Sequence, residues 1–238
     1  MSLKESLHVK RLEDDNDRQS AMRVLKATYR EEKNWVADEQ KMFSSADLQD
    51  PGVSWFVVFS DDQPIGVLRV LYNPPLGLYK EYGFKMIGGG IDVEKFIRNN
   101  RIAEIGRFAV LPEYRRYTGV VLALMRAASR ETVERGFTHY ITDIFEGEKH
   151  SPYLFHTRVM GFQPVATHDV GELNCPNRRI TMVLDIKTAY NRLRKTQRKV
   201  FVGLTGDWPD DLHAQLHDGT EQNGFAEALN TLKRAVSM

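Results

Sequence analysis

The sequence predicts an α/β (α+β) fold in which helices flank both faces of a mixed central β-sheet. Residues 53–60 and 65–72 are two apolar segments joined by a polar turn, which indicates a β-hairpin. Residues 102–145 then read as strand, helix, strand, and such a unit places two parallel strands in the sheet. The hairpin and the parallel pair together make the sheet mixed, and a helical C-terminal extension is expected beyond it.

The segments before the hairpin are expected to form a strand and a helix. Apolar and polar residues alternate over 6–12, as in a half-buried strand. The acidic and amide residues at 15–17 are typical of a helix start. Apolar residues at helical spacing then predict a helix over 17–35, and residues 43–50 are of mixed character.

The middle of the chain alternates between strong and weak signals. Residues 61–64, Asp-Asp-Gln-Pro, supply the turn of the hairpin. Residues 73–92 are rich in Gly and Pro and are expected to be irregular, with a short helix at 92–99. Residues 102–111 read as a buried strand.

A long helix and the remaining strands follow. Residues 117–134 carry an apolar face at helical spacing, and Gly136 ends that helix. The other expected elements are strands at 137–145, 162–167 and 180–186 and a short helix at 151–160 that ends at Gly161.

The C-terminal segment differs in charge from the rest. Residues 187–199 predict a basic helix, residues 207–219 are acidic and rich in turn formers, and residues 221–236 predict a terminal amphipathic helix. We therefore expect a catalytic domain over 1–186 and an extension over 187–238 that packs on it or mediates assembly.

Composition excludes several classes of protein. The 238 residues include 33 Lys plus Arg and 32 Asp plus Glu, and a net charge of +1 argues against a general nucleic-acid binder. The hydrophobic fraction of 42% excludes a disordered chain. Cys175 is the single cysteine, so no intrachain disulfide or cysteine metal cluster is possible, and no metal site is expected. The absence of a signal peptide or an apolar run of about 20 residues leads us to expect a cytoplasmic protein without a membrane span.

The most informative stretch is the turn between the strand at 102–111 and the long helix. The unsatisfied N–H groups at a helix start favour a bound anion, typically a phosphate. Arg115 and Arg116 can add charge-assisted hydrogen bonds, and Gly119 permits close approach of the backbone. The alternative is a helix whose first turn is merely basic.

This stretch resembles the acyl-thioester-binding segment of the GNAT N-acyltransferase superfamily. That pattern is Arg/Gln-x-x-Gly-x-Gly/Ala, and here it reads Arg116-Tyr-Thr-Gly119-Val-Val121, with Val at the last position. Met160-Gly161-Phe162 resembles the end of the superfamily's Tyr-x-x-x-Gly-Phe element. Thr157 occupies the tyrosine position, which leaves its neighbour His156 as a candidate proton donor or as a helix residue without a catalytic role.

One branch of the superfamily is resembled more closely over residues 20–186. The strand Glu104-Ile-Gly-Arg107-Phe-Ala is similar to one in acyl-homoserine-lactone synthases and long-chain N-acyl amino acid synthases. Tyr29 and Trp35 match an aromatic pair of that branch. Arg69 and the pair Asp47-x-x-Asp50 match its strand arginine and its paired aspartates.

The resemblance implies an N-acyltransferase that moves a fatty-acyl group from a carrier-protein or CoA thioester to a small amine, such as an amino acid. Three alternatives remain open at this point. They are an acyl-homoserine-lactone synthase, an acetyl-CoA-dependent N-acetyltransferase, and a non-catalytic protein that binds an acyl ligand. No tightly bound cofactor is expected.

The resemblance also implies roles for individual residues. The catalytic candidates are Glu104, Arg107 and His156. The candidates for binding the thioester donor are Val110, Arg115, Arg116, Thr118, Gly119 and Val121. The candidates for binding the acceptor are Trp35, Asp47, Asp50, Arg69 and Phe108. Glu104 is either the base that accepts the amine's proton or a structural partner of Arg69 or Arg107. Asp47 and Asp50 either hold the amine or cap a loop.

Glu104 and Arg107 are three residues apart, so a regular strand would point them to opposite faces. A bulge between them, permitted by Gly106, would bring both toward one cleft. This prediction can be tested by structure alone.

A basic run marks a possible partner. Residues 187–199 contain six basic residues and no acidic one, and this run either docks an acidic acyl carrier protein or forms a solvated helix face. The residues are Lys187, Arg192, Arg194, Lys195, Arg198 and Lys199. Residues 206–221 contain five acidic residues and no Lys or Arg, so the two segments could also pair within a chain or across a homodimer.

Overall fold

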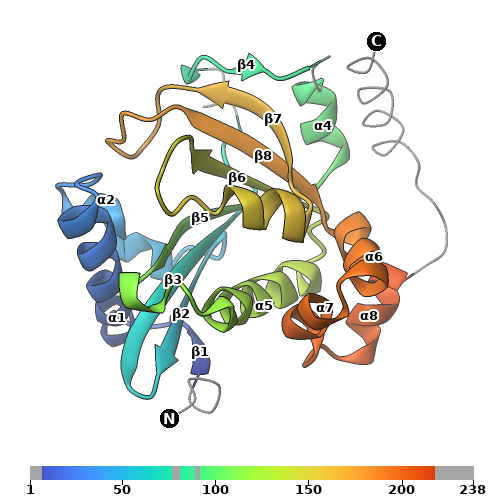
Figure 1. The fold of residues 1–238 in the computed structure, drawn as a ribbon, viewed down its shortest axis with the longest axis horizontal. Coiled ribbons are helices and arrows are strands. Elements are labelled where there is room, and N and C mark those ends of the chain that lie inside the picture. Colours follow the sequence, from blue (N-terminus) through green and yellow to red (C-terminus); the bar gives the residue numbers. More distant parts are fainter. Residues whose placement is uncertain (1–6, 77–80, 89–91, 218–238) are drawn as a thin grey trace.

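The computed structural model of the chain describes residues 7–76, 81–88 and 92–217. In this part of the chain, eight strands form one sheet in the order β1-β2-β3-β5-β6-β8-β7-β4 (Figure 1). Neighbouring strands are antiparallel except β5 and β6, which are parallel. The strands are β1 (Leu7–Arg11), β2 (Val53–Ser60), β3 (Gln63–Tyr72), β4 (Lys85–Met86), β5 (Ile102–Val110), β6 (His139–Phe145), β7 (Gln163–His168) and β8 (Arg179–Asp185).

Helices of three kinds connect and cover these strands. The α-helices are α1 (Asp15–Leu25), α2 (Glu39–Met42), α4 (Val93–Asn99), α5 (Thr118–Glu134), α6 (Ile186–Thr196), α7 (Arg198–Thr205) and α8 (Asp210–His217). The 3-10 helices are η3 (Ser45–Leu48) and η4 (Pro112–Tyr114), and the π-helices are η2 (Lys26–Glu32) and η5 (Phe155–Met160). The mixed sheet with helices on both faces confirms the predicted fold class.

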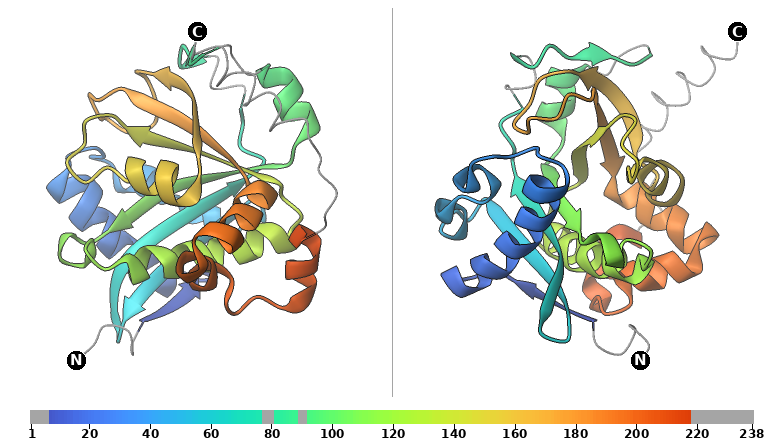
Figure 2. Two further views of the ribbon diagram at one scale, coloured as in Figure 1. Left: turned by 45° about the vertical axis from the view of Figure 1, so that its right-hand side comes forward. Right: turned by 60° about the vertical axis from the view of Figure 1, so that its left-hand side comes forward.

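The two faces of the sheet carry separate hydrophobic clusters because side chains alternate along a strand. On β2, Trp55 and Val57 pack with α1, whereas Phe56 and Val58 pack with α5. Figure 2 shows these two helices on opposite sides of β2 and β3. A third, smaller cluster packs α4 against β5, β6 and β8 on the α1 face. The α1 face is therefore covered by two separate clusters, one around α1 and the other around α4.

The C-terminal helices α6, α7 and α8 pack beside α5 (Figure 1). Buried side chains on all three helices, including Tyr190, Leu204 and Leu212, belong to the same cluster as α5. Asp207 lies 3.8 Å from Arg126 on α5 and not against the basic run. The division of the chain at residue 186 stays a prediction.

Several predicted elements differ from the observed ones. The helix expected over 17–35 is α1 followed by the π-helix η2, and the helix expected over 187–199 breaks at Gln197 between α6 and α7. The segments expected to be irregular at 73–92 and 207–219 contain β4 and α8. The helix predicted at 221–236 lies outside the described residues. No helix in the described ranges is long and apolar enough to cross a bilayer.

Candidate active site

The parallel strands β5 and β6 pair only at their beginnings. Ile102, Ala103 and Glu104 pair with β6, and beyond Glu104 the two strands pair no further. A cavity of about 510 Å³ is lined by residues from both diverging strands. Its volume is in the range of small-molecule sites in proteins. The divergence leaves one edge of β5 unpaired by β6 and open to a ligand.

A bulge on β5 brings the predicted catalytic residues to this cavity. Arg69 of β3 pairs with Gly106 and Val67 pairs with Ala109, so Arg107 and Phe108 together face one residue of β3. This confirms the predicted bulge, and both Glu104 and Arg107 line the cavity.

Arg107, rather than Gly106, takes the left-handed backbone conformation, with φ at 48°. Strain of this kind costs on the order of 1–3 kcal/mol and is concentrated at functional sites. Gly106 serves a different purpose, because a Cβ there would lie 2.9 Å from Glu104 Oε1 and 3.2 Å from Arg69 Nη2. Its missing side chain makes room for these two groups.

Glu104 and Arg69 form an ion pair in the cavity wall. Arg69 Nη2 donates to Glu104 Oε1 at 3.0 Å, and the two side chains are only 13% and 22% exposed for Arg69 and Glu104. Burial raises the pKa of Glu104, while Arg69 opposes the rise and the charges of Glu172 and Asp143 add to it. A carboxylate with a raised pKa is a better proton acceptor than an exposed one.

Arg107 lies beside this pair. Its Nη2 donates to Glu172 Oε2 at 2.9 Å and to the Lys41 carbonyl at 3.1 Å, and its side chain is 8% exposed. Burial lowers the pKa of Arg107, and the like charge of Arg69 lowers it further. The Nε atoms of Arg69 and Arg107 are both buried and have no hydrogen-bond partner among the described residues. Two buried donors on one wall are therefore left to a ligand.

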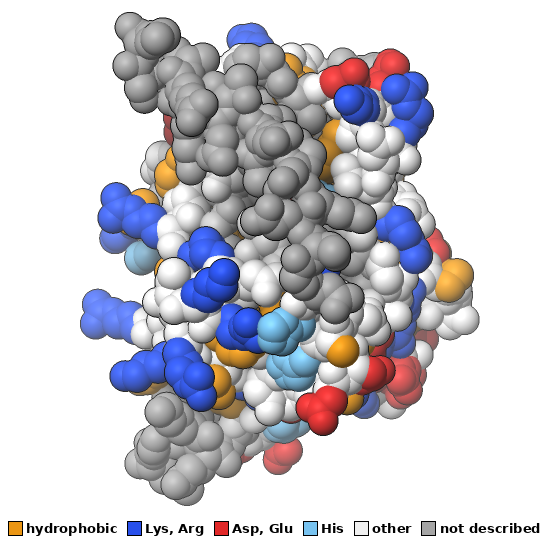
Figure 3. Space-filling view, turned by 90° about the vertical axis from the view of Figure 1, so that its right-hand side faces the viewer, with side chains coloured by type: hydrophobic (Ala, Val, Ile, Leu, Met, Phe, Trp, Pro, Cys, Tyr) orange, Lys and Arg blue, Asp and Glu red, His pale blue; other side chains and the backbone are white. Residues whose placement is uncertain are grey.

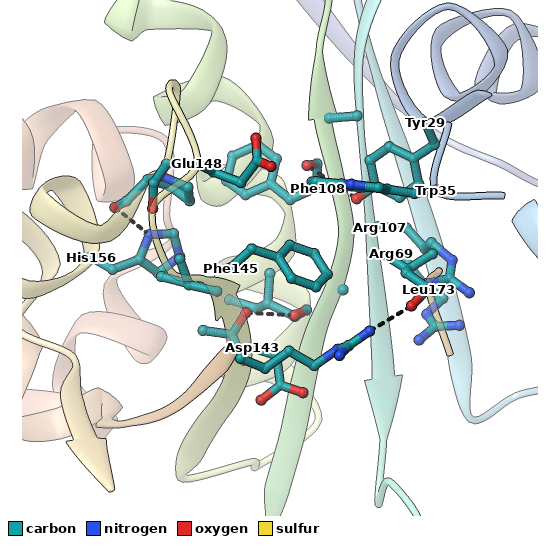
Figure 4. Close-up of a pocket in the computed structure, with 18 of the residues that line it drawn as sticks. Tyr29, Trp35, Arg69, Arg107, Phe108, Asp143, Phe145, Glu148, His156 and Leu173 are labelled. Carbon is teal, nitrogen blue, oxygen red and sulfur yellow. Dashed lines mark hydrogen bonds between the residues drawn. The ribbon is translucent and has the colours of Figure 1, made fainter. Parts of the chain in front are cut away.

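Aromatic residues flank the two arginines. Trp35 lies edge-on to Tyr29 at 5.4 Å and contacts Phe145 at 4.5 Å between ring centroids. Tyr29 belongs to the π-helix η2, and its hydroxyl donates to the Phe108 carbonyl at 3.4 Å. Figure 4 shows Tyr29, Trp35, Arg69 and Arg107 grouped together at the cavity. π-helical turns are rare and often occur at functional sites.

Part of the predicted donor site also lines the cavity. Val110, Arg115, Thr118 and Val121 do so, whereas Arg116 and Gly119 are exposed and do not. The helix α5 begins at Thr118, one residue later than expected, and no side chain caps it.

Arg115 is engaged within the chain. It forms a two-pronged ion pair with Glu32, with 2.7 Å between Nη1 and Oε1, and its Nε donates to the Val110 carbonyl at 3.0 Å. The hydrogen bond from Arg115 lowers the pKa of Glu32 against the effect of burial. An anionic ligand at Arg115 would have to compete with Glu32, a neighbour that the sequence did not reveal.

Asp47 and Asp50 do not line the cavity. Asp47 accepts a hydrogen bond from Trp55 Nε1 at 2.9 Å, and Asp50 accepts one from the Gly52 backbone N–H at 2.7 Å. Their carboxylates hold the loop before β2, which is the alternative considered from the sequence.

His156 lies in the π-helix η5 and lines the cavity, but its environment does not suit a proton donor. Its Nδ1 lies 3.0 Å from the Pro152 carbonyl, which only accepts, so Nδ1 carries the proton and Nε2 is bare. Burial lowers the pKa of His156 to about 4. A neutral ring with a bare Nε2 has no free proton to give to a thiolate, which argues against His156 as the acid.

We expect His156 to make the protein sensitive to acid. The folded state keeps the ring neutral down to a pKa of about 4, whereas the unfolded chain protonates near 6.5, so the unfolded state binds more protons between these values. The full difference is worth about 3 kcal/mol. The free energy of unfolding, measured with denaturant at pH 7 and 4.5, should fall less in His156→Gln than in the wild type. His150→Gln, at an exposed position, provides the control. An equal fall in the free energy of unfolding in the wild type and both variants would contradict this assignment.

Part of the cavity wall is apolar. Phe108, Ile144, Phe145 and Phe155 form this part.

Several polar residues of the cavity wall were not predicted from the sequence. Four of them are Asp143 on β6, Glu172 in the loop before β8, Arg179 on β8 and Tyr82. The signal that could have revealed Asp143 is a lone carboxylate inside the apolar strand segment Ile141-Thr-Asp-Ile-Phe145, on the same face as Ile141. The others lie in segments without a regular pattern or at a strand end.

The chain matches one protein family by sequence. Residues 20–184 match the family described as "N-acyl amino acid synthase FeeM". A comparison with curated proteins found no significant match.

Solved structures of acyltransferases share this fold. FeeM, an N-acyl amino acid synthase from uncultured soil microbes, has a TM-score of 0.60 and 16% identity, over 78% of this chain and 93% of that chain. A protein described as a GNAT-family acetyltransferase from Desulfovibrio desulfuricans has a TM-score of 0.53 and 14% identity, over 76% and 99% of the two chains. PaiA N-acetyltransferase from Thermoplasma acidophilum, in complex with coenzyme A, has a TM-score of 0.50 and 12% identity, over 76% and 99%.

Proposed function

Because the chain belongs to the FeeM family of N-acyl amino acid synthases, we propose that it transfers a fatty-acyl group from a thioester to the α-amine of an amino acid. The chain is an N-acyltransferase of the GNAT type. The amino-acid acceptor, the length of the acyl group and the carrier of the thioester are the proposed parts.

The observation that carries the proposal is the arrangement of charges on one wall of the cavity. A free amino acid has a carboxylate and an ammonium group two bonds apart across Cα. The unpartnered Nε atoms of Arg69 and Arg107 can receive the carboxylate. Glu104, ion-paired to Arg69 at 3.0 Å, is then placed to hold the amine and accept its proton.

The attack would take place where β5 bulges. The deprotonated amine adds to the thioester carbonyl, and the negative charge that develops on oxygen needs N–H donors. Beyond Glu104 the backbone of β5 has no partner on β6, so N–H groups from this part of β5 are the candidates. The acyl chain would lie along the apolar wall that includes Phe145 and Phe155.

The purified chain should be incubated with acyl thioesters and amino acids, and the products identified by mass spectrometry. N-acyl amino acids, with release of free thiol, are the expected result. Acyl lactones formed from S-adenosylmethionine would instead indicate an autoinducer synthase. Turnover of acetyl-CoA alone would contradict the long-chain proposal, and binding without thiol release would contradict transfer itself.

The donor is either acyl-CoA or an acyl carrier protein, and the basic run bears on this choice. Figure 3 shows Lys and Arg side chains gathered on the side of the molecule that α6 to α8 form. Arg192 donates to the Val159 carbonyl and Arg194 contacts His217, so both are engaged within the chain. Lys195, Arg198 and Lys199 remain exposed, and Lys187 is half-buried.

These exposed residues lie behind the cavity wall, because Gln197 Nε2 donates to the Arg158 carbonyl of η5 at 3.3 Å. We expect the triple variant Lys195→Glu, Arg198→Glu, Lys199→Glu to lower kcat/KM for an acyl carrier protein donor by roughly tenfold or more at low salt, because association is steered by charge. The acyl-CoA reaction of the same variant is the matched control. Equal losses with both donors would argue against docking at this site.

A further inference from the structure

A buried pair of titratable groups opens onto the same cavity and has no role in the reaction so far. Asp143 Oδ2 on β6 lies 3.1 Å from His168 Nε2 at the end of β7, and Asp143 Oδ1 accepts from Thr181 Oγ1 at 2.7 Å. The His168 side chain is 0% exposed, whereas that of Asp143 is 29% exposed and lines the cavity. Figure 4 shows Asp143 at the cavity, coming from the β6 side.

The hydrogen bonds of His168 determine where its protons are. Its Nδ1 lies 2.7 Å from the Val170 carbonyl, which can only accept, so Nδ1 carries a proton. Nε2 and the carboxylate oxygen would repel each other at 3.1 Å unless a second proton lay between them. The pair therefore holds one shared proton, and Asp143 is the member that can deliver it into the cavity.

The surroundings keep this proton away from solvent. Tyr82 stacks on the His168 ring at 5.7 Å and Phe84 packs against it at 4.8 Å. Arg179 of β8 lies opposite His168 of β7 in the backbone register of the two strands. Its guanidinium donates to the Asp169 and Leu173 carbonyls. Glu104, Glu148 and Glu172 are the other acidic residues that line the cavity. The cavity is thus the route by which the shared proton can leave.

The sheet places this pair next to the predicted base. Glu104 pairs with Ile141 on the parallel strand β6, and Asp143 follows two residues later on the same face. Because β5 and β6 diverge beyond this pair and both carboxylates line the cavity, a reacting centre can lie between them. The charge of Asp143 also contributes to the raised pKa of Glu104.

Aminolysis of a thioester needs both a base and an acid. An ammonium nitrogen loses two protons on its way to an amide, and the departing sulfur gains one. Glu104 suits the base, and His156 does not suit the acid because its Nε2 is bare and the ring is neutral. Thr157 donates its hydroxyl to the Tyr153 carbonyl at 2.8 Å, so it is not placed for this task either.

We propose that Asp143, recharged by the buried His168, is the general acid that protonates the leaving thiolate. As the C–S bond of the tetrahedral intermediate breaks, its electron pair goes to sulfur and the sulfur takes the proton from Asp143. His168 ends neutral with its Nδ1 proton in place, and the pair regains a proton from those released by the amine. His168 acts through Asp143 and is a positioning residue. The inference rests on the proposed function.

The test compares two donors with different leaving groups in Asp143→Asn and His168→Gln. An alkyl thioester such as acyl-CoA needs its thiolate protonated, whereas an aryl thioester releases a weakly basic thiolate that does not. We expect kcat to fall roughly 10²-fold or more with the alkyl donor and less than about tenfold with the aryl donor. The quantity compared is the ratio of kcat with the alkyl donor to kcat with the aryl donor. Both values come from one protein preparation, so partial misfolding lowers them equally and cancels in the ratio.

Asp169→Asn, which removes an exposed carboxylate next to His168, is the matched control. Its kcat should change little, and by the same factor with both donors. Equal losses with both donors in Asp143→Asn would overturn the proposal, and so would a leaving-group-dependent loss in His156→Gln instead. The wild-type protein still forms the N-acyl amino acid in these cases, so failure of the acid is distinct from failure of the proposed function.

Discussion

Replacing Glu104 by Gln should lower kcat by roughly 10²-fold or more while leaving the fold intact. Gln keeps the shape of the side chain and can still contact Arg69, but it cannot accept a proton from the amine. Steady-state rates at saturating donor and acceptor measure the effect. The exposed Glu113 provides a control, since Glu113→Gln removes a carboxylate far from the base. Near-normal turnover in folded Glu104→Gln would remove Glu104 from the role of base.

The pH dependence of the wild type gives a second readout of the same group. A carboxylate acts as a base only when it is ionised, so kcat/KM for the amino acid should rise with pH through the pKa of Glu104. Burial raises that pKa, so the rise should lie above the range of an ordinary glutamate. Arg69 holds the pKa down, and Arg69→Gln should therefore move the rise to still higher pH. A rise that disappears in Glu104→Gln would identify the group.

Replacing Arg69 by Gln should also raise KM for the amino acid by roughly 10- to 100-fold, because a buried charged hydrogen bond to the carboxylate is lost. The diagnostic quantity is the ratio of kcat/KM for the amino acid to that for its carboxamide. That ratio should fall in Arg69→Gln, and also in Arg107→Lys, which keeps the charge but loses the Nε donor. A ratio equal to that of the wild type would show that the carboxylate is bound elsewhere.

The elements with strong periodicity were predictable because local patterning decides them. The strand 53–60 was predicted with its observed bounds, and the helix α5 was predicted to within one residue of its start. The two-residue strand β4 could not be predicted, because so short an edge strand has no alternation to detect. The helix α8 was missed because Pro209 and two aspartates read as a turn, although the same residues are common at a helix start.

The candidate site shows a similar division. Glu104, Arg107 and Arg69 were predicted as site residues from the motif that they form, and all three line the cavity. Asp47 and Asp50 belong to the same resemblance, yet Asp47 accepts a hydrogen bond from Trp55 of β2 and Asp50 accepts one from Gly52 in its own loop. A motif records which residue types occur in order, whereas the direction of a loop side chain depends on the contacts around it.

By itself the sequence determined the mixed sheet and the charges available on β5, because these follow from short-range patterns of polarity, and the resemblance to the GNAT superfamily implied the bulge on that strand. Only the tertiary structure decided that β5 and β6 diverge beyond Glu104 and that Arg115 is paired with Glu32. It also decided that the left-handed residue of the bulge is Arg107 and that Asp143 meets His168. These contacts join residues 25 to 83 positions apart in the chain, and no local pattern specifies which distant groups will share one cavity.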